Sequence, residues 1–225
     1  MLLDNETQIK SKIINSGCEL LSSGLVVGTW GNLSARIPNT PFIAVTPSGR
    51  NYRTLAVDDI VLVDIDANII KGMLKPTSEL ALHLAIYKKR QDVKAIIHTH
   101  SVFASACAVA RHPIPPIVED VVQLVGGSVD VAEYALNGSA ELAENAVQAL
   151  GLKHAVLLAN HGLVCCGCNI EEALLACELV EKAAQIFIYA NQISGAKALS
   201  KNDVAVMHEF YLEDYRKRQG GQAND

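Results

Sequence analysis

A buried strand that ends in two histidines is the feature that most constrains this chain. Residues 93–100, VKAIIHTH, form an apolar run with two β-branched isoleucines, which is typical of an interior strand. Side chains alternate along a strand, so His98 and His100 are expected on the same face, with converging imidazoles. A single histidine at a strand end is usually a packed residue. Two histidines on the same face of a strand indicate a metal site, because imidazole is a preferred ligand of zinc and related metals.

His161 is the candidate for a third ligand. It follows an apolar run, AVLLA, and lies between Asn160 and Gly162 at a second predicted strand end. Three histidines with an open fourth position are typical of a catalytic zinc site, because the open position accepts a substrate oxygen. Spacing alone leaves a second interpretation open, in which His161 caps its loop and never meets the other two.

Length and pattern predict one α/β domain. The chain has 225 residues, half of them hydrophobic, and we assign residues 1–218 to the domain and 219–225 to a polar tail. Strands and helices mix throughout, with no repeat or linker, which favours a layered arrangement. Several strand-to-strand links are too short for crossover helices, and no GxGxxG motif follows a strand. We therefore expect a mixed, largely antiparallel sheet in place of a dinucleotide-binding fold.

Charge and hydropathy exclude several classes of protein. A net charge of −5 without a basic stripe argues against nucleic-acid binding. No apolar run approaches the length of a membrane span, and the N-terminus lacks a signal-peptide pattern, so we predict a cytoplasmic protein with no membrane partner. Its six cysteines should then stay reduced. Cys165, Cys166 and Cys168 are interpreted as small buried hydrophobes, although a thiolate site is the alternative.

Glu79 is the candidate acid or base. It opens a predicted helix over residues 79–90, with Ser78 as the expected N-cap, where the helix dipole favours a negative charge. Glutamates at helix starts commonly do no more than cap. His83 lies one turn further on the same face. It could orient the Glu79 carboxylate or could simply pack in the core.

Three polar loops are suited to bind a phosphate group. They supply hydroxyls, a side-chain amide and unhindered backbone amides near strand ends and a helix N-terminus. Each loop taken alone could equally be a simple turn. Together they predict a small phosphorylated substrate, and the candidate contacts are Thr29, Gly31, Asn32, Thr46, Gly49, Thr77 and Ser78.

The order of these motifs resembles the class II aldolase/adducin family, typified by L-fuculose-1-phosphate aldolase. The motifs are TWGNLS (29–34), TPSG (46–49), PTSE (76–79), HTH (98–100) and NHG (160–162), and the resemblance runs from about residue 6 into the last helix. It implies a three-layer α/β/α domain and a homotetramer with active sites between subunits. It also implies Zn2+, or Mn2+ or Co2+, held by His98, His100 and His161.

Position by position, the resemblance assigns further roles. It makes Glu79 the catalytic acid/base. It matches Gly31, Asn32, Thr77 and Ser78 to phosphate-binding positions, with Thr29, Thr46 and Gly49 assisting.

The sequence departs from the family pattern at two places. Trp30 stands where a small residue is usual. The segment IVEDVVQLVGG lacks the tyrosine that reaches a neighbouring subunit's site in the fuculose-phosphate enzymes. Asp120 is a candidate replacement for that tyrosine, or a solvated or capping acid, and Tyr211 or Tyr215 could instead close over the site.

The resemblance implies a metal-dependent aldolase. Such an enzyme cleaves a ketose 1-phosphate to an aldehyde and dihydroxyacetone phosphate through a metal-stabilised enediolate, with Glu79 moving the proton at carbon 3. Alternatives within the family are a ribulose-5-phosphate 4-epimerase and a methylthioribulose-phosphate dehydratase. A non-catalytic adducin-like interaction module is the alternative from another class, although adducin-type domains are expected to lose the histidines that this chain retains.

Overall fold

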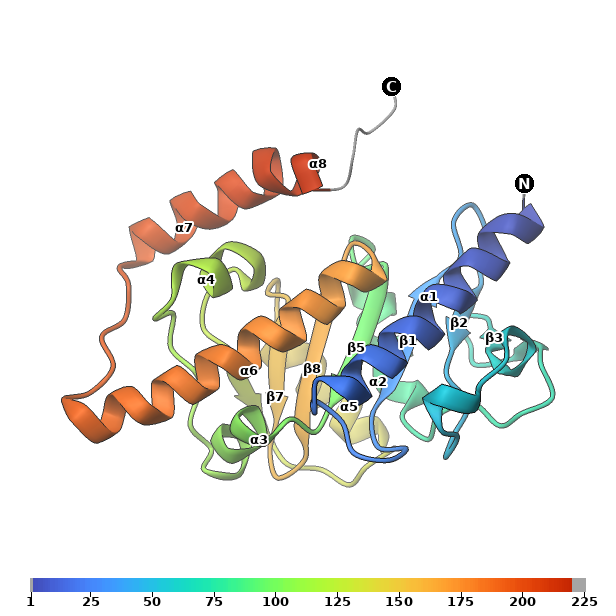
Figure 1. The fold of residues 1–225 in the computed structure, drawn as a ribbon, viewed down its shortest axis with the longest axis horizontal. Coiled ribbons are helices and arrows are strands. Elements are labelled where there is room, and N and C mark those ends of the chain that lie inside the picture. Colours follow the sequence, from blue (N-terminus) through green and yellow to red (C-terminus); the bar gives the residue numbers. More distant parts are fainter. Residues whose placement is uncertain (1, 220–225) are drawn as a thin grey trace.

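One eight-stranded sheet forms the centre of the computed structural model, which describes residues 2–219 (Figure 1). Its strand order is β4-β3-β2-β1-β5-β8-β7-β6. Every neighbouring pair is antiparallel except β6 and β7, which are parallel. The predicted mixed, largely antiparallel sheet is therefore confirmed. The strands are β1 (Asn32–Arg36), β2 (Ile43–Val45), β3 (Val61–Val63), β4 (Ile69–Lys71), β5 (Ala95–Thr99), β6 (Asp130–Ala132), β7 (Ala155–Leu158) and β8 (Gly162–Gly167).

Helices cover both faces of this sheet. One face packs against α1, α3, α4 and α6, and the other packs against α2 and α5 (Figure 1). The arrangement is the predicted three-layer α/β/α fold. The helices are α1 (Leu2–Ser22), α2 (Leu80–Lys89), α3 (Val102–Val109), α4 (Glu119–Val125), α5 (Ala140–Leu150), α6 (Ile170–Ile193), α7 (Lys201–Phe210) and α8 (Arg216–Gln219).

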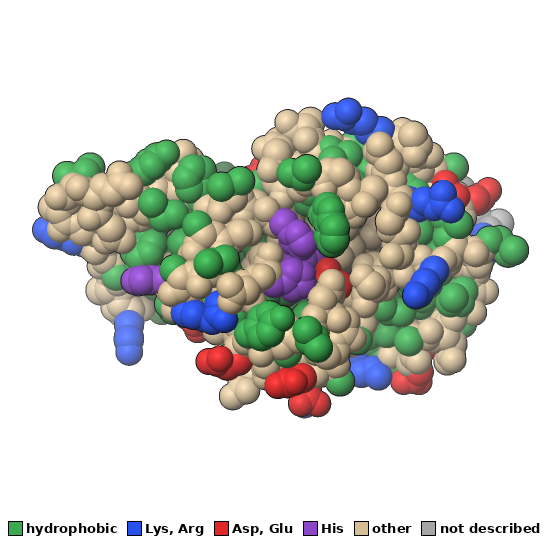
Figure 2. Space-filling model, turned by 90° about the horizontal axis from the view of Figure 1, so that it is seen from below, with side chains coloured by type: hydrophobic (Ala, Val, Ile, Leu, Met, Phe, Trp, Pro, Cys, Tyr) green, Lys and Arg blue, Asp and Glu red, His purple; other side chains and the backbone are tan. Residues whose placement is uncertain are grey.

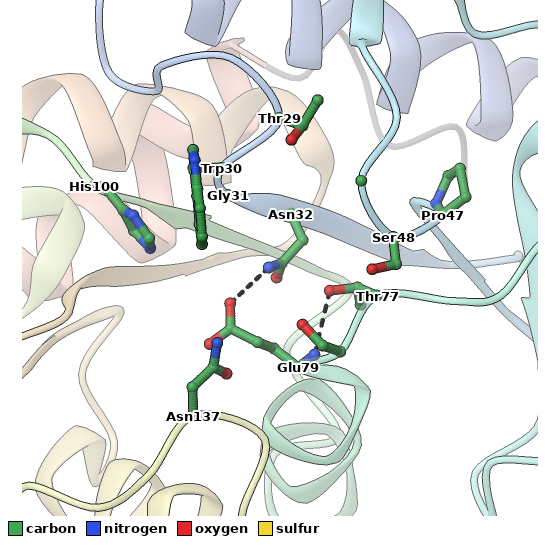
Figure 3. Close-up of a pocket in the computed structure, with 12 residues that line it drawn as sticks. Thr29, Trp30, Gly31, Asn32, Pro47, Ser48, Thr77, Glu79, His100 and Asn137 are labelled. Atoms are coloured by element: carbon green, nitrogen blue, oxygen red, sulfur yellow. Dashed lines mark hydrogen bonds between the residues drawn. The ribbon is translucent and has the colours of Figure 1, made fainter.

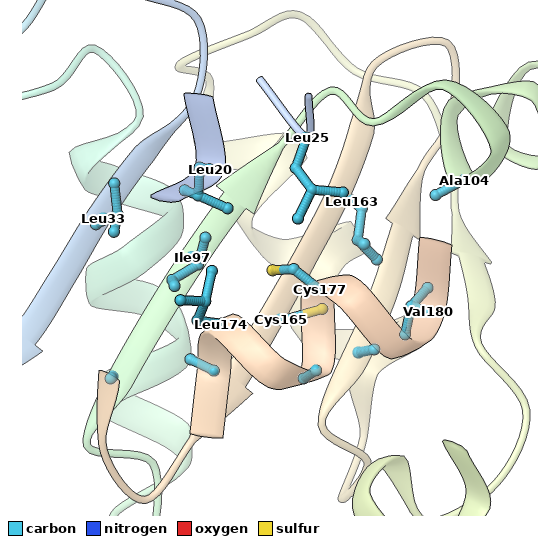
Figure 4. Packing of buried hydrophobic residues seen from close by; sticks show 14 of the residues in the cluster. Leu20, Leu25, Leu33, Ile97, Ala104, Leu163, Cys165, Leu174, Cys177 and Val180 are labelled. Atoms are coloured by element: carbon cyan, nitrogen blue, oxygen red, sulfur yellow. The ribbon is translucent and has the colours of Figure 1, made fainter. Parts of the chain in front are cut away.

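The alternation of side chains along the strands creates two hydrophobic cores. In β5, Ile97 packs toward α1 and α6, whereas its neighbour Ile96 packs toward α2 and α5. Figure 4 shows the first core, in which Ile97 lies near Leu174 and Cys177 of α6. A strand buried on both faces shows a continuous apolar run, which explains the pattern of residues 95–97.

The three clustered cysteines do not form a thiolate site. Cys165 and Cys166 are adjacent on β8, so they point into opposite cores, and both are fully buried. Burial raises the pKa of the Cys166 thiol to about 12 and favours the neutral form. The interpretation of these two cysteines as small buried hydrophobes is confirmed. Cys168 lies past the end of β8 and is half-buried.

Sequence patterns predicted the long elements better than the short ones. The apolar spacing of residues 170–193 predicts a long helix with Asn169 as its N-cap, and α6 has those bounds. Asn169 caps it by accepting a hydrogen bond from the Glu172 N–H at 2.8 Å. Residues 117–134 hold only short apolar pieces that predict no particular element, yet they contain α4 and β6. Both are too short to display a clear period. Across the described residues 2–219, no helix is long and apolar enough to cross a membrane.

A buried carboxylate attaches the C-terminal segment to the core. Glu172 of α6 accepts hydrogen bonds from the Tyr211 hydroxyl at 2.8 Å, from Arg216 Nε at 2.7 Å and from the Cys168 N–H. Burial alone would raise the pKa of Glu172, but these donors outweigh it and leave the pKa below its ordinary value. The predicted polar tail, apart from Gln219 at the end of α8, lies outside the described residues.

We expect Glu172→Gln to destabilise the protein by about 1–3 kcal/mol at neutral pH, because the charged hydrogen bonds are lost. The pKa of the Glu172 carboxyl is lower in the folded protein than in the unfolded chain, where it is near 4.5. Its contribution to the free energy of unfolding is therefore complete above about pH 4.5 and is lost as the pH falls through the pKa of the folded state. The stability gap between wild type and variant should therefore narrow below about pH 4.5. Urea unfolding at pH 7 and at acid pH measures it.

The neighbouring variant Glu171→Gln is the control, because that side chain is exposed and its one ion-pair partner among residues 2–219 is Lys12. Its effect should stay within about 0.5 kcal/mol. A difference in the free energy of unfolding between wild type and Glu172→Gln that does not change with pH would contradict the proposed role of the charge.

Candidate active site

Three imidazoles converge where β5 ends and the β7–β8 turn lies beside it. His98, His100 and His161 each place a ring nitrogen within 4.8 Å of the others, and His98 Nε2 lies 2.8 Å from His100 Nε2. The ring centroids are 4.7 to 5.1 Å apart, with the rings steeply inclined to one another. The structure thus brings together the three histidines that the sequence singled out, and His161 does not merely cap its own loop.

Strand pairing explains this convergence. His98 lies on β5, and His100 lies just beyond the end of the strand, on the same face. β8 is the antiparallel neighbour of β5, with Thr99 opposite Leu163, so the β7–β8 turn that carries His161 lies beside the histidine pair. Gly162 permits this approach, because a Cβ atom there would lie 2.3 Å from the Thr99 carbonyl oxygen.

Burial keeps the imidazoles neutral. It lowers the pKa of His98 to about 3, with a further contribution from His100, and lowers the pKa of His161 to about 4. Burial also lowers the pKa of His100. The Nδ1–H of His98 donates a hydrogen bond to the Leu163 carbonyl at 3.0 Å, which leaves Nε2 as the nitrogen with the free lone pair. That nitrogen faces the centre of the cluster.

Glu79 lies against the histidine cluster. Its Oε2 is 3.2 Å from His98 Nε2, and its Oε1 is 3.3 Å from His161 Nε2. Helix α2 begins at Leu80, so the expectation that Ser78 is the N-cap was wrong. Glu79 holds that position but makes no side-chain capping bond. Its side chain turns toward the histidine cluster and is held there by Asn32, whose Nδ2 donates to Oε2 at 2.7 Å (Figure 3).

The carboxylate opens onto a polar cavity of about 280 Å³. Three segments of the chain form most of its wall: the loop before β1, the loop after β2 and the loop before α2 (Figure 3). His100 and Asn137 complete it. In the space-filling view, histidine side chains gather in a hollow bordered by apolar side chains (Figure 2). The lining residues are Thr29, Trp30, Gly31, Asn32, Pro47, Ser48, Gly49, Thr77, Ser78, Glu79, His100 and Asn137.

Six of the seven predicted phosphate contacts line this cavity, and Thr46 does not. The Thr46 side chain is buried behind the wall, where its hydroxyl accepts a hydrogen bond from the Leu33 N–H at 3.1 Å. Thr46 therefore supports the junction of β1 and β2. Gly31 adopts φ +100°, and a Cβ atom there would lie 2.8 Å from the His98 carbonyl, so the loop requires glycine.

Sequence reasoning missed Asn137. It lies in the loop between β6 and α5, a segment that was not assigned. The next residue, Gly138, passes close to the loop before α2, because a Cβ atom there would lie 3.0 Å from the Ser78 carbonyl. An Asn-Gly pair indicates a turn, but no local signal shows which distant loop the turn meets.

Three further candidates lie away from the cavity within one chain. Asp120 on α4 forms an ion pair with Lys182 of α6. Tyr211 is buried against Glu172, and Tyr215 lies beside Tyr211 with ring centroids 6.0 Å apart. None of the three lines the cavity of its own chain.

Trp30 stands at the cavity entrance. Its side chain is 64% exposed, and its ring centroid is 6.1 Å from that of His100. A large exposed aromatic ring beside a polar cavity can cover a substrate at low entropic cost.

The comparisons with known proteins agree with this arrangement. The family described as Class II Aldolase and Adducin N-terminal domain matches residues 11–188. The chain is 36% identical over 204 residues to a 5-deoxy-D-ribulose 1-phosphate aldolase of Bacillus thuringiensis serovar kurstaki, covering 91% of this chain and 94% of that one. It is 34% identical over 205 residues to an L-fuculose phosphate aldolase of Escherichia coli O6:H1, with the same coverage.

A solved structure shares the fold over nearly the whole chain. The structure of an L-fuculose 1-phosphate aldolase is 36% identical and superposes with a TM-score of 0.88, covering 91% of this chain and 96% of that one. The family match spans most of the chain and the relatives exceed 30% identity. The protein therefore belongs to the class II aldolase and adducin family, and it is an enzyme of the aldolase, or lyase, type.

Proposed function

We propose that this protein is a metal-dependent aldolase that cleaves a small ketose 1-phosphate into dihydroxyacetone phosphate and an aldehyde. The observation that carries the proposal is a buried carboxylate, Glu79, within 3.3 Å of two histidines of a convergent triad and at the wall of a polar cavity. The relatives named as 5-deoxy-D-ribulose 1-phosphate and L-fuculose phosphate aldolases support a 1-phosphorylated ketose.

The donor set fits a divalent metal ion. Three neutral imidazoles point nitrogen lone pairs at one site, and the Leu163 carbonyl orients the first of them. Zn2+ suits such ligands, and Mn2+ or Co2+ is accepted by the same set. When bound, the ion would act as a Lewis acid toward the oxygens of the ketose.

When the bond between carbons 3 and 4 of the ketose breaks and the carbon 4 hydroxyl gives up its proton, Glu79 would deliver a proton to carbon 3 to complete dihydroxyacetone phosphate. Asn32 holds its Oε2, whereas its Oε1 is buried without a hydrogen-bond partner among the described residues. An unsatisfied buried carboxylate oxygen is costly unless a ligand or a proton uses it. That oxygen is therefore suited to give the proton to carbon 3 in cleavage and to take it from dihydroxyacetone phosphate in the reverse reaction.

The cavity wall would hold the phosphate through neutral donors. Its lining residues include no lysine or arginine. The hydroxyls of Thr29, Ser48 and Ser78, the backbone amides at Gly31 and Gly49, and the N-terminus of α2 would bind the anion in their place. The same lining offers no lysine for a Schiff base, which favours metal chemistry over an imine mechanism.

We also propose a cytoplasmic homotetramer with active sites between subunits. The six cysteines are all free, which is consistent with a reducing compartment. Apolar side chains exposed near the cavity, including Val27, Val102 and Leu136, are suited to contact a neighbouring subunit. Asp120, Tyr211 and Tyr215 would reach an active site only from such a neighbour.

The first test measures cleavage of L-fuculose 1-phosphate, 5-deoxy-D-ribulose 1-phosphate and related ketose 1-phosphates. We expect dihydroxyacetone phosphate release by the metal-loaded protein, and a fall in kcat of at least about 10²-fold in Glu79→Gln. Glu171→Gln, a surface change of the same kind, should leave kcat unaltered. Bound metal without cleavage would point to the epimerase or dehydratase alternatives, and no bound metal would point to an adducin-like module.

The second test measures metal affinity against pH. Three histidines with ordinary pKa values would lose about 10³-fold in affinity between pH 7.5 and 5.5, because protons compete for each ligand. Burial lowers the pKa of His98 to about 3 and that of His161 to about 4, so we expect a loss below about tenfold. Competition with a chelator at the two pH values measures the metal affinity, and a loss of about 10³-fold would contradict neutral histidines. In the same assay, His161→Ala should abolish tight binding of the metal.

The third test examines the phosphate contacts. Removing one hydroxyl by Thr29→Ala should raise KM by about ten- to hundredfold with little change in kcat, because a hydrogen bond to a charged group is lost. Thr40→Ala is the matched control, since its hydroxyl donates to the Ile37 carbonyl in a turn outside the cavity lining. Equal KM values for the two variants would contradict the phosphate assignment.

A further inference from the structure

A row of buried hydrogen bonds runs from Glu79 into the layer between β1 and α2. Asn32 Nδ2 lies 2.7 Å from Glu79 Oε2, and Asn32 Oδ1 lies 2.6 Å from His83 Nε2. Ser34 Oγ lies 2.6 Å from His83 Nδ1 and 2.9 Å from the Tyr87 hydroxyl. All five side chains are at most 5% exposed.

The spacing of these residues matches their secondary structure. Asn32 and Ser34 are two residues apart on β1, so they share one face of the strand. Glu79 is the N-cap of α2, and His83 and Tyr87 follow it at intervals of four residues, so the three side chains lie on one face of the helix. The strand face and the helix face therefore meet as two interleaved rows of polar groups.

Donor and acceptor rules give this row a single direction. A carboxylate only accepts, so the Asn32 amide nitrogen must face Glu79 and its oxygen must face His83. His83 must then donate from Nε2 and accept at Nδ1. Burial lowers the pKa of His83 to about 4, so its ring carries one proton at neutral pH. Ser34 donates to that ring and accepts from Tyr87, so every donation points toward the carboxylate.

We propose that His83, Ser34 and Tyr87 are positioning residues that act through Asn32 to hold the Glu79 carboxylate in its working orientation. The inference rests on the proposed function of Glu79. Both polar ends of the Asn32 side chain are engaged, one by Glu79 and one by His83. Asn32 therefore serves the carboxylate, beyond the phosphate contact that the resemblance implied for it.

The far end of the row is anchored by Arg36 of β1. Its Nη2 donates to the Tyr87 carbonyl at 2.8 Å, and its guanidinium carbon lies 4.6 Å from the centre of the Tyr87 ring. These contacts hold the Tyr87 side chain in place. A carboxylate held at one oxygen by a rigid row leaves the other oxygen, Oε1, free for the proton.

The experiment uses variants that remove single links from the metal-loaded protein. Tyr87→Phe and Ser34→Ala should each lower kcat by about three- to tenfold with KM and metal content unaltered, because the carboxylate loses orientation and not its charge. His83→Phe should lower kcat further, and His83→Gln, which restores a donor, should recover part of the loss. His154→Phe, a change at a buried histidine outside the cavity lining, should leave kcat within twofold.

A double-mutant cycle separates positioning from a general loss of structure. In a Glu79→Gln background, Ser34→Ala and Tyr87→Phe should produce no further decrease in the residual rate, because they act only through the carboxylate. Exchange of the hydroxymethyl protons of dihydroxyacetone phosphate with deuterated water follows the proton-transfer step alone. The rate of this exchange should decrease across the variants in the same order as kcat does.

Two failures are distinguishable. A wild-type protein that binds metal but neither cleaves ketose 1-phosphates nor exchanges these protons would overturn the proposed function, and this inference with it. An active wild-type protein with unaltered Ser34→Ala and Tyr87→Phe rates, or with equal fold-losses in both backgrounds, would overturn the inference alone.

Discussion

The pairing of β5 between β1 and β8 is the constraint on which the rest of this site depends. β5 carries His98 and is fully buried, so both of its edges must find backbone partners. On one edge β1 places Asn32 opposite His98, and on the other β8 brings the turn with His161. A shift of β5 by one residue would turn His98 and His100 to the face of the sheet opposite Asn32.

The site concentrates polar groups where the protein is otherwise apolar. His98, Glu79 and His83 are almost fully buried, and the interior disfavours each charge unless a partner is present. The histidines avoid that penalty because burial keeps their rings neutral. For Glu79, the hydrogen-bonded row behind Asn32 reduces the penalty, because its directed donors stabilise the negative charge. The same contacts that permit burial therefore also orient the group.

Much of this arrangement could be predicted from local pattern, and the reasons are physical. The two-residue period of a strand places His98 and His100 on one face, and the structure agrees. Long elements such as α6 have many residues to display a period, so their bounds were predicted closely. Short elements do not, and α4 and β6 went unassigned. Asn137 was missed because a turn residue carries no mark of the loop it faces.

The sequence by itself determined the residue types, their parity on each element and the layered mixture of strands and helices. Only the tertiary structure decided which distant elements meet. It brought the β7–β8 turn to the histidine pair, placed Thr46 behind the cavity wall, and buried Tyr211 against Glu172. It also joined α2 to β1 through His83, for which the sequence had left two roles open. Distances between segments follow from strand pairing and packing of the whole chain, and these contacts leave no trace in local spacing.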